Sequence, residues 1–194
     1  MLAGDGLLTT AFEIMNKDMF IHFDNQNELK KRIRASYEIA HGAGCSGMIA
    51  GQTADIENEN KSCSKEMLDY IHINKTGALI IAAVRAGAHL GGADSEKLSA
   101  LTDYADNLGL AFQICDDILD IVGEESQLGK NTGVDVTKGK STYPSIHGLN
   151  ESYDRFYELL SDANDIMAPY YDNAEFFVDI IHELENRIDE KGQR

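Results

Sequence analysis

Apolar residues recur at the three- and four-residue spacing of an α-helix along almost the whole chain, and this periodicity limits what the chain can fold into. One stripe runs from Leu7 to Met15 and another from Leu29 to Ala40. Only two prolines interrupt the 194 residues, and no run alternates apolar and polar residues for long enough to predict a strand. We therefore expect an all-α fold, with residues 1–194 forming a single helical domain.

Capping residues and glycines divide this pattern into helices. The stretch from Gly42 to Gly51 is rich in glycine and alanine, which lowers helix stability and predicts either a close approach of two helices or a helix break. The other boundaries follow from caps, glycines and a proline: a helix from Ser64 through His89, a longer one from Asp94 or Ser95 to Val122 ended by Gly123, a loop over 124–140, a helix with Pro144 near its first turn, and helices over 152–170 and 173–190.

The charge and the cysteines narrow the classes of function. Seventeen Lys and Arg against 33 Asp and Glu give a formal net charge of -16, which argues against a nucleic-acid binder and against docking on anionic lipid. The longest apolar run, Ala78 to Val84, is too short to span a membrane, so we expect no stable membrane association. Three widely spaced cysteines fit neither a disulfide framework nor a zinc site, and they favour a cytoplasmic location.

The most informative segment is FQICDDILD, at residues 112–120. Asp116 and Asp120 are four residues apart and share one helix face, while Asp117 lies about 100° round the helix. The other positions are mostly apolar, so these clustered carboxylates need a compensating charge. An acidic stripe at the wet edge of the helix is the plain alternative. We favour binding of a hard cation, because Mg²⁺ prefers oxygen ligands and commonly keeps substrate phosphates in its shell.

The basic residues are consistent with an anionic substrate. Lys75 lies inside an apolar predicted helix, where a lysine is unusual unless it reaches solvent or meets an anion. Lys130 and Lys140 lie in the glycine-rich loop after the aspartates, and such a loop could close over a phosphate. Each lysine taken alone is more often an ordinary surface residue. Gln52 and Asp55 form a second polar pair, which by itself could be the surface end of a helix.

Taken in order, these segments resemble the short-chain trans-prenyl diphosphate synthases, with the bacterial farnesyl diphosphate synthases (geranyltranstransferases) as the most similar subgroup. The matching segments are LAGDGLL at 2–8, GMIAGQTAD at 47–55, KTGAL at 75–79, FQICDDILD at 112–120, GK at 129–130 and GKSTYP at 139–144. The resemblance implies an isoprenoid synthase-type helical bundle with a central cavity, in a homodimer. It also implies head-to-tail condensation of isopentenyl diphosphate with dimethylallyl or geranyl diphosphate to give farnesyl diphosphate.

The resemblance further implies a role for each matching residue. Three Mg²⁺ ions would bridge two aspartate-rich motifs and the allylic diphosphate. Asp116 would be the main Mg²⁺ ligand here, and Asp117 and Asp120 would support it through waters. The diphosphate contacts would be Lys75, Lys130 and Lys140, and Thr76 and Gln113 would place oxygen atoms near the allylic cation. Gln52 and Asp55 would line the polar rim, with Asp55 orienting Lys75, and Phe112 would face the isopentenyl group.

One departure from the family is large, because this chain carries only the second aspartate-rich motif. We expect it to be the C-terminal portion of a longer enzyme, without the N-terminal helices, and to be inactive alone. Three alternatives remain: a natural short homologue that acts as a non-catalytic partner subunit, a terpene cyclase with the same bundle, and an acidic helical adaptor. The adaptor explains the charge but not the aspartates inside an apolar helix.

Overall fold

The structure is a computed structural model that describes residues 2–61, 63–126 and 141–192. These residues form helices joined by short turns, so the all-α prediction is confirmed. The α-helices are α1 (Leu2–Ile21), α2 (Gln26–Ala43), α3 (Met48–Glu57), α4 (Lys65–His72), α5 (Ala78–Gly91), α6 (Ser95–Ser126), α8 (Tyr143–His147), α9 (Leu149–Met167) and α10 (Glu175–Gly192), with a π-helical segment η1 (Ile73–Gly77) and a 3₁₀ segment η2 (Ala168–Asn173).

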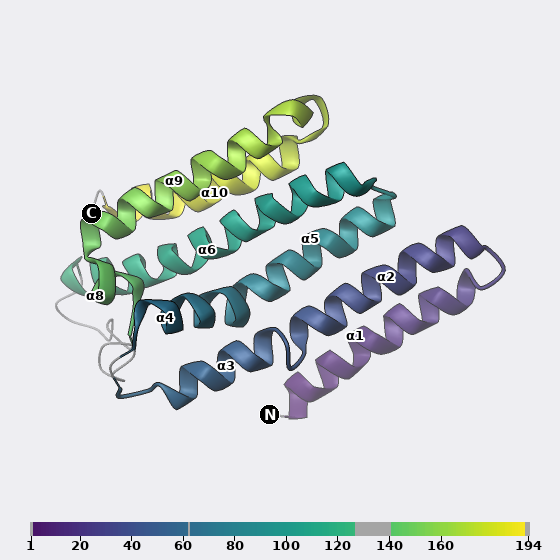
Figure 1. Cartoon of the computed structure of the whole chain (residues 1–194), viewed down its shortest axis with the longest axis horizontal. Helices are drawn as coiled ribbons and strands as arrows, with labels where there is room; N and C mark the ends of the chain where they lie inside the picture. Colours follow the sequence, from purple (N-terminus) through teal and green to yellow (C-terminus); the bar gives the residue numbers. More distant parts are fainter. Residues whose placement is uncertain (1, 62, 127–140, 193–194) are drawn as a thin grey trace.

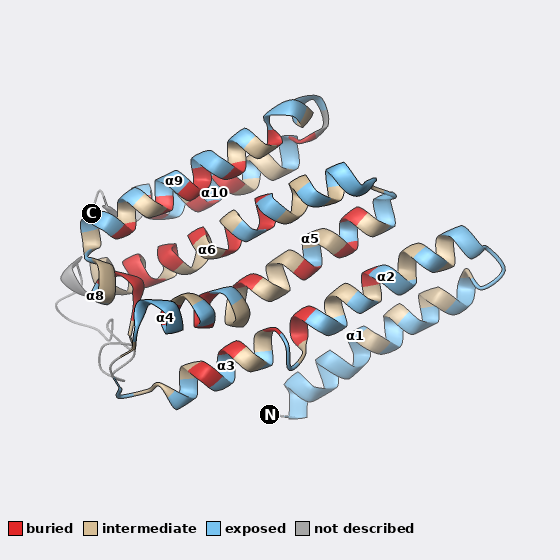
Figure 2. Ribbon diagram, viewed as in Figure 1, coloured by how far each residue is buried: buried red, intermediate tan, exposed pale blue. Residues whose placement is uncertain are grey.

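The long helices lie side by side, with α6 between the pair α9 and α10 and the row that contains α5 (Figure 1). Helix α6 packs against α9 and α10 on one side and against α5 on the other, α5 packs against α2, and α1 packs on α2. Burial is concentrated on α6 and α9, whereas α1 has no buried residue (Figure 2). The largest fully buried side chains on α6 and α9 are Tyr104, Ile114, Ile118, Phe156 and Leu159. None of the described helices has both the length and the apolar composition needed to cross a membrane.

Two predicted helix starts are confirmed by their caps, and a third by the position of a proline. The Ser64 side chain accepts a hydrogen bond from the backbone N–H of Met67, and Asp94 Oδ1 accepts one from the N–H of Lys97. Each satisfies an N–H at a helix end that has no partner within the helix. Pro144 lies in the first turn of α8, where its missing N–H removes no helical hydrogen bond.

Two predicted helix ends are wrong. Helix α6 continues through Gly123 to Ser126, because a glycine ends a helix when it adopts a left-handed conformation and otherwise only weakens it. Gly92 does adopt that conformation, with φ of 73°, and it ends α5. Helix α9 stops at Met167 rather than at 170, and the chain tightens into η2 around Pro169, whose ring cannot sit inside a regular helix.

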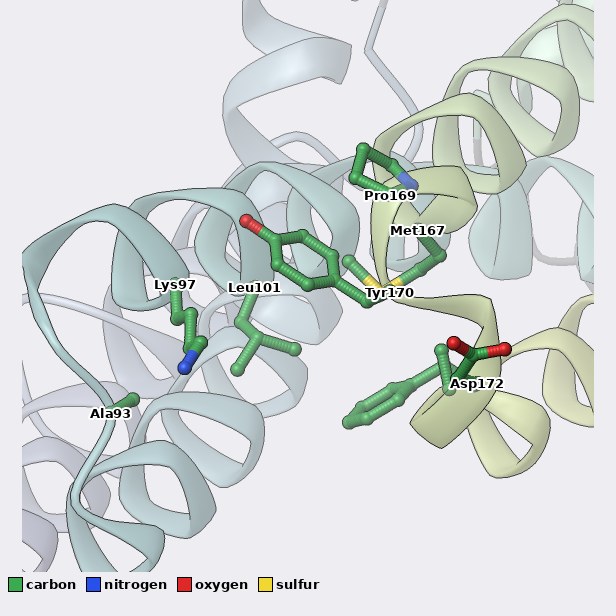
Figure 3. Close-up of a pocket in the computed structure, with 9 residues that line it drawn as sticks. Ala93, Lys97, Leu101, Met167, Pro169, Tyr170 and Asp172 are labelled. Carbon is green, nitrogen blue, oxygen red and sulfur yellow. The ribbon is translucent and has the colours of Figure 1, made fainter.

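A hollow of about 420 Å³ lies between the start of α6 and η2 (Figure 3). Its lining includes Lys97 and Leu101 from α6 and Tyr170 from η2. Asp116 is fifteen residues beyond Leu101 on the same helix, a separation of roughly 22 Å at the α-helical rise. This hollow is therefore distinct from the carboxylate cluster.

Candidate functional site

The segment that carries Lys75 and Thr76 is a π-helical turn, η1, inserted between α4 and α5. Such turns inside α-helices are rare and occur often at functional sites. Two glycines allow neighbouring helices to come close to it. A Cβ atom at Gly51 of α3 would lie 2.6 Å from the Cα of Lys75, and one at Gly109 of α6 would lie 3.1 Å from the Cα of Gly77.

The composition of the glycine-rich stretch predicted either a close approach or a helix break, and the structure shows both. The helical conformation is interrupted between α2 and α3, where Gly44 caps the first helix and Gly47 precedes the second. The stretch also approaches other helices closely, because a Cβ at Gly42 would lie 2.7 Å from the carbonyl oxygen of Ala78. The result is that α3 lies directly against η1.

Lys75 is held by a carboxylate from α3. Its Nζ donates to Oδ2 of Asp55 at 2.7 Å, and the side chains are 33% and 13% exposed. The charge of Lys75 is thus fixed at the surface beside α3 while its partner is largely covered. Gln52, one turn earlier on α3, is exposed, so the predicted pair lies on the helix that borders Lys75.

Thr76 begins a line of hydrogen bonds that enters the core. Its Oγ1 donates to Oε1 of Gln113 at 2.8 Å, and Nε2 of Gln113 donates to Oδ1 of Asp117 at 3.0 Å. The other oxygen, Oδ2, accepts the backbone N–H of Tyr143 at 2.7 Å. These bonds connect η1, α6 and α8 through one buried carboxylate.

Asp117 is buried, with 6% of its surface exposed. The Nε2 of His72 lies 3.5 Å from its Oδ2. Burial lowers the pKa of His72 to about 4, and the nearby charge of Lys75 acts in the same direction, so this imidazole is neutral at pH 7. Each oxygen of Asp117 accepts a hydrogen bond from the protein itself.

The two aspartates that share a face have different surroundings. Asp116 is 42% exposed, and its Oδ1 accepts a hydrogen bond at 2.8 Å from Nη2 of Arg187 on α10. The Arg187 guanidinium also lies over the ring of Phe112, 5.1 Å from its centroid. Oδ2 of Asp120 is buried and has no hydrogen-bond partner among the residues that the structure describes.

The structure thus gathers most of the predicted residues at the end of the bundle where α3, η1 and the second half of α6 meet (Figure 1). Lys130 and Lys140 lie outside the described residues. Among the residues that the structure describes, no group of three or more His, Cys, Asp or Glu side chains has metal-binding geometry.

Three residues that contact the predicted site residues were not predicted from the sequence to do so. Arg187 lies in the final helix, where no motif marks it. Tyr143 contributes only a backbone N–H, which carries no residue-specific signal. His72 could have been found, because it precedes Thr76 by four residues and so shares its face in a regular helix.

The chain is similar to known proteins over most of its length. A family model described as polyprenyl synthetase matches residues 1–168. The farnesyl diphosphate synthase of Geobacillus stearothermophilus is 45% identical over 149 residues, covering 77% of this chain and 49% of that protein. The farnesyl diphosphate synthase of Escherichia coli strain K12 is 42% identical over 164 residues, covering 84% and 54%. The chain therefore spans about half the length of these curated relatives.

A solved structure supports the same comparison. A geranyltransferase from Helicobacter pylori, complexed with magnesium and isoprenyl diphosphate, aligns with a TM-score of 0.75 at 26% sequence identity. The alignment covers 97% of this chain and 60% of that one. The helical arrangement, and not only the local motifs, is shared with that structure.

Proposed function

Because this chain belongs to the polyprenyl synthetase family, as its motifs predicted, we propose that it supplies one side of a prenyltransferase active site. In the proposed reaction an allylic diphosphate, dimethylallyl or geranyl, loses its diphosphate to leave an allylic cation. The double bond of isopentenyl diphosphate attacks that cation, a carbon–carbon bond forms, and a proton is lost. The product of successive additions would be farnesyl diphosphate.

One observation carries this proposal: Lys75, a predicted diphosphate contact, lies on η1 beside Thr76, which contacts Gln113 of α6. Thr76 and Gln113 are the two residues expected near the allylic cation. The side chain of Lys75 extends toward α3, and that of Thr76 toward α6, where Gln113 accepts its hydrogen bond. A cationic group and an oxygen-lined surface thus lie on consecutive residues. An allylic diphosphate needs both, one for the leaving anion and one for the cation left behind.

We propose that the carboxylates of α6 hold Mg²⁺. The buried, unpartnered Oδ2 of Asp120 is unfavourable unless a cation or proton compensates it, and Asp116 lies four residues away on the same face. Asp116 and Asp120 would hold the metal, with Asp117 supporting them from the core. When bound, the metal would neutralise charge on the departing diphosphate. We expect three Mg²⁺ ions per complete site.

The chain's own side chains would position the substrates. Lys75, fixed by Asp55, would contact the allylic diphosphate, and Gln52 would line the polar rim. Phe112 would face the isopentenyl group, at a position where its ring now lies under Arg187. Lys130 and Lys140 would complete the diphosphate contacts from the loop outside the described residues.

The test is a prenyl-transfer assay on the protein as its own cell produces it, with labelled isopentenyl diphosphate and Mg²⁺. Asp116→Ala should lower kcat by at least about 100-fold, the size expected for loss of an electrostatic group at the reacting centre, with little change in melting temperature. Unchanged turnover in this variant would reject the metal role. The chain of residues 1–194 by itself should show no turnover, and Mg²⁺-dependent product from it would contradict that expectation.

A second candidate is a non-catalytic partner subunit, and the surface of α1 favours it. Leu7, Ile14 and Ile21 are 74%, 62% and 71% exposed, and their seven-residue spacing places them on one face of α1. Large apolar side chains gathered on one surface commonly mark a protein interface. This candidate predicts tight association with a full-length farnesyl diphosphate synthase and no tight Mg²⁺–diphosphate binding of its own. Sedimentation of the chain alone and mixed with such a synthase would separate it from the homodimer that we propose for the enzyme. Product formation without isopentenyl diphosphate would instead indicate a terpene cyclase.

A further inference from the structure

The hydrogen bonds between Thr76, Gln113 and Asp117 have a fixed direction. An ionised carboxylate can only accept hydrogen bonds, so the group that Gln113 turns toward Asp117 must be its NH₂. The amide oxygen of Gln113 then faces Thr76, and the Thr76 hydroxyl must donate its single hydrogen to it. The observed contacts, at 3.0 Å and 2.8 Å, have this pattern.

The anchor of this line is outside the reach of solvent. Asp117 is 6% exposed, and its second oxygen accepts the backbone N–H of Tyr143, a donor that can neither turn nor reverse. Gln113 and Thr76 are half-buried, so the line runs from the core toward the surface beside Lys75. A buried group whose partners are all satisfied is well suited to fix the orientation of its neighbours.

We propose that Asp117 is a positioning residue that turns the lone pairs of the Thr76 hydroxyl toward the reacting carbon. Because the hydroxyl hydrogen is committed to Gln113, only electron pairs remain for whatever lies beside Thr76. Such a surface favours a cationic carbon over a neutral or anionic group. This inference deepens the proposed prenyl transfer and rests on it, and it gives Asp117 a role separate from metal binding.

Asp117→Asn should reverse the donor–acceptor direction of the hydrogen bonds from position 117 to Thr76, while the side chain at position 117 keeps the same size and shape. The amide oxygen of the new side chain must accept the N–H of Tyr143, because leaving that buried N–H without a partner costs about 1–3 kcal/mol. Its NH₂ group then faces Gln113, Gln113 turns its own NH₂ toward Thr76, and the Thr76 hydrogen points outward. The number of hydrogen bonds is kept, so stability should change little while catalysis falls.

A second substitution restores the original direction. In the double variant Asp117→Asn with Gln113→Glu, the carboxylate at position 113 accepts from the amide at 117 and again from Thr76. The count of negative charges equals that of the original protein. Gln113→Glu alone places two carboxylates against each other. It therefore serves as the control for the added negative charge at position 113, without the amide at position 117 that the double variant provides.

The experiment measures single-turnover rates, KM, Mg²⁺ dependence and melting temperature in the intact, Mg²⁺-loaded protein. We expect Asp117→Asn to lower the rate by about 10- to 100-fold, somewhat less than complete removal of a catalytic hydrogen-bonding group, with KM within about threefold. The double variant should be faster than either single variant, because the Thr76 hydrogen again points at position 113. Failure of the double variant to recover, or an unchanged rate in Asp117→Asn, would overturn the inference.

Other outcomes separate this inference from the proposed function. If saturating Mg²⁺ restores the rate of Asp117→Asn, Asp117 acts through the metal and the positioning role is wrong. If the intact protein forms no prenyl product, the proposed function fails, and the inference is then judged by the Gln113 side-chain amide resonances. They should move upfield in Asp117→Asn, where the amide faces a hydroxyl instead of a carboxylate, and unchanged resonances would overturn it.

Discussion

Nη2 of Arg187 lies 2.8 Å from Oδ1 of Asp116, so the last helix supplies a cation to a carboxylate that we assign to Mg²⁺. The two side chains are 43% and 42% exposed, and exposed pairs of this kind contribute little to stability. Arg187→Gln should therefore leave the fold intact and tighten Mg²⁺ binding by at most about fivefold, because the metal no longer competes with a guanidinium. Calorimetric titration with Mg²⁺ at low ionic strength measures this.

The matched control is Arg155→Gln, which removes an exposed pair with Glu158 on α9. It changes the net charge of the protein by the same amount and leaves the contact between Arg187 and Asp116 in place. An equal gain in Mg²⁺ affinity in both variants would show that only net charge matters. A loss of affinity in Arg187→Gln would show that Arg187 helps to hold the metal and its anion.

Gly51→Ala should destabilise the protein through a clash with η1. The new Cβ would lie 2.6 Å from the Cα of Lys75, and overpacking of this kind costs about 1–3 kcal/mol. Gly87→Ala is the control, because Gly87 is also helical and a Cβ there meets nothing within 4 Å. That variant should be neutral or more stable by up to about 1 kcal/mol, the difference in helix propensity. Urea unfolding of both variants checks the pair, and equal stabilities would contradict the close approach.

Local sequence signals predicted the features that depend on neighbours along the chain. Ser64 and Asp94 start helices because their side chains accept an N–H three residues later. The four-residue spacing of Asp116 and Asp120 placed them on one face. The glycines of the 42–51 stretch predicted a break or a close approach, since each follows from the missing Cβ, but they did not show that both occur.

Local sequence signals could not predict the features that depend on residues far apart in the chain. The sequence predicted a regular α-helix at η1, because the residue pattern of this π-helical turn does not differ from that of an α-helix. Asp117 and Asp116 are adjacent and chemically identical, yet one enters the core and the other meets Arg187, more than 70 residues away. Only the packing of α8 and α10 against α6 decides which is which.

Glu38→Gln should weaken the contact between α2 and α5 in a pH-dependent way. Glu38 accepts from Nη2 of Arg85 at 2.8 Å, and its Oε1 lies 3.2 Å from Nε2 of His89. The Arg85 hydrogen bond, followed by that of His89, lowers the pKa of Glu38. A carboxyl group whose pKa is lower in the folded protein adds stability above its unfolded pKa, and this stability is lost as the pH falls.

We expect Glu38→Gln to lower the free energy of unfolding by about 1–3 kcal/mol at pH 7, as for a partly buried hydrogen bond to a charged group. The difference from the unchanged protein should shrink below about pH 4.5 and vanish once Glu38 is protonated in both states. Urea unfolding at several pH values tests this. Glu158→Gln, at a carboxylate that is 60% exposed, should change stability by less than about 0.5 kcal/mol. A difference that grows on acidification would contradict the prediction.

Lys75→Gln should weaken binding of inorganic diphosphate in the presence of Mg²⁺. A hydrogen bond between a cation and an anion contributes about 1.5–3 kcal/mol, so the dissociation constant should rise about 10- to 100-fold. Asp55→Asn keeps the charge of Lys75 but replaces the carboxylate of the 2.7 Å contact by a neutral amide, and it should weaken binding by only about threefold. Calorimetric titration of the intact protein measures both. Lys97→Gln, at a lysine beside the other end of α6, removes the same charge and should have no effect. If Lys97→Gln weakens binding as much as Lys75→Gln does, the anion is attracted by overall charge, and Lys75 is not part of its site.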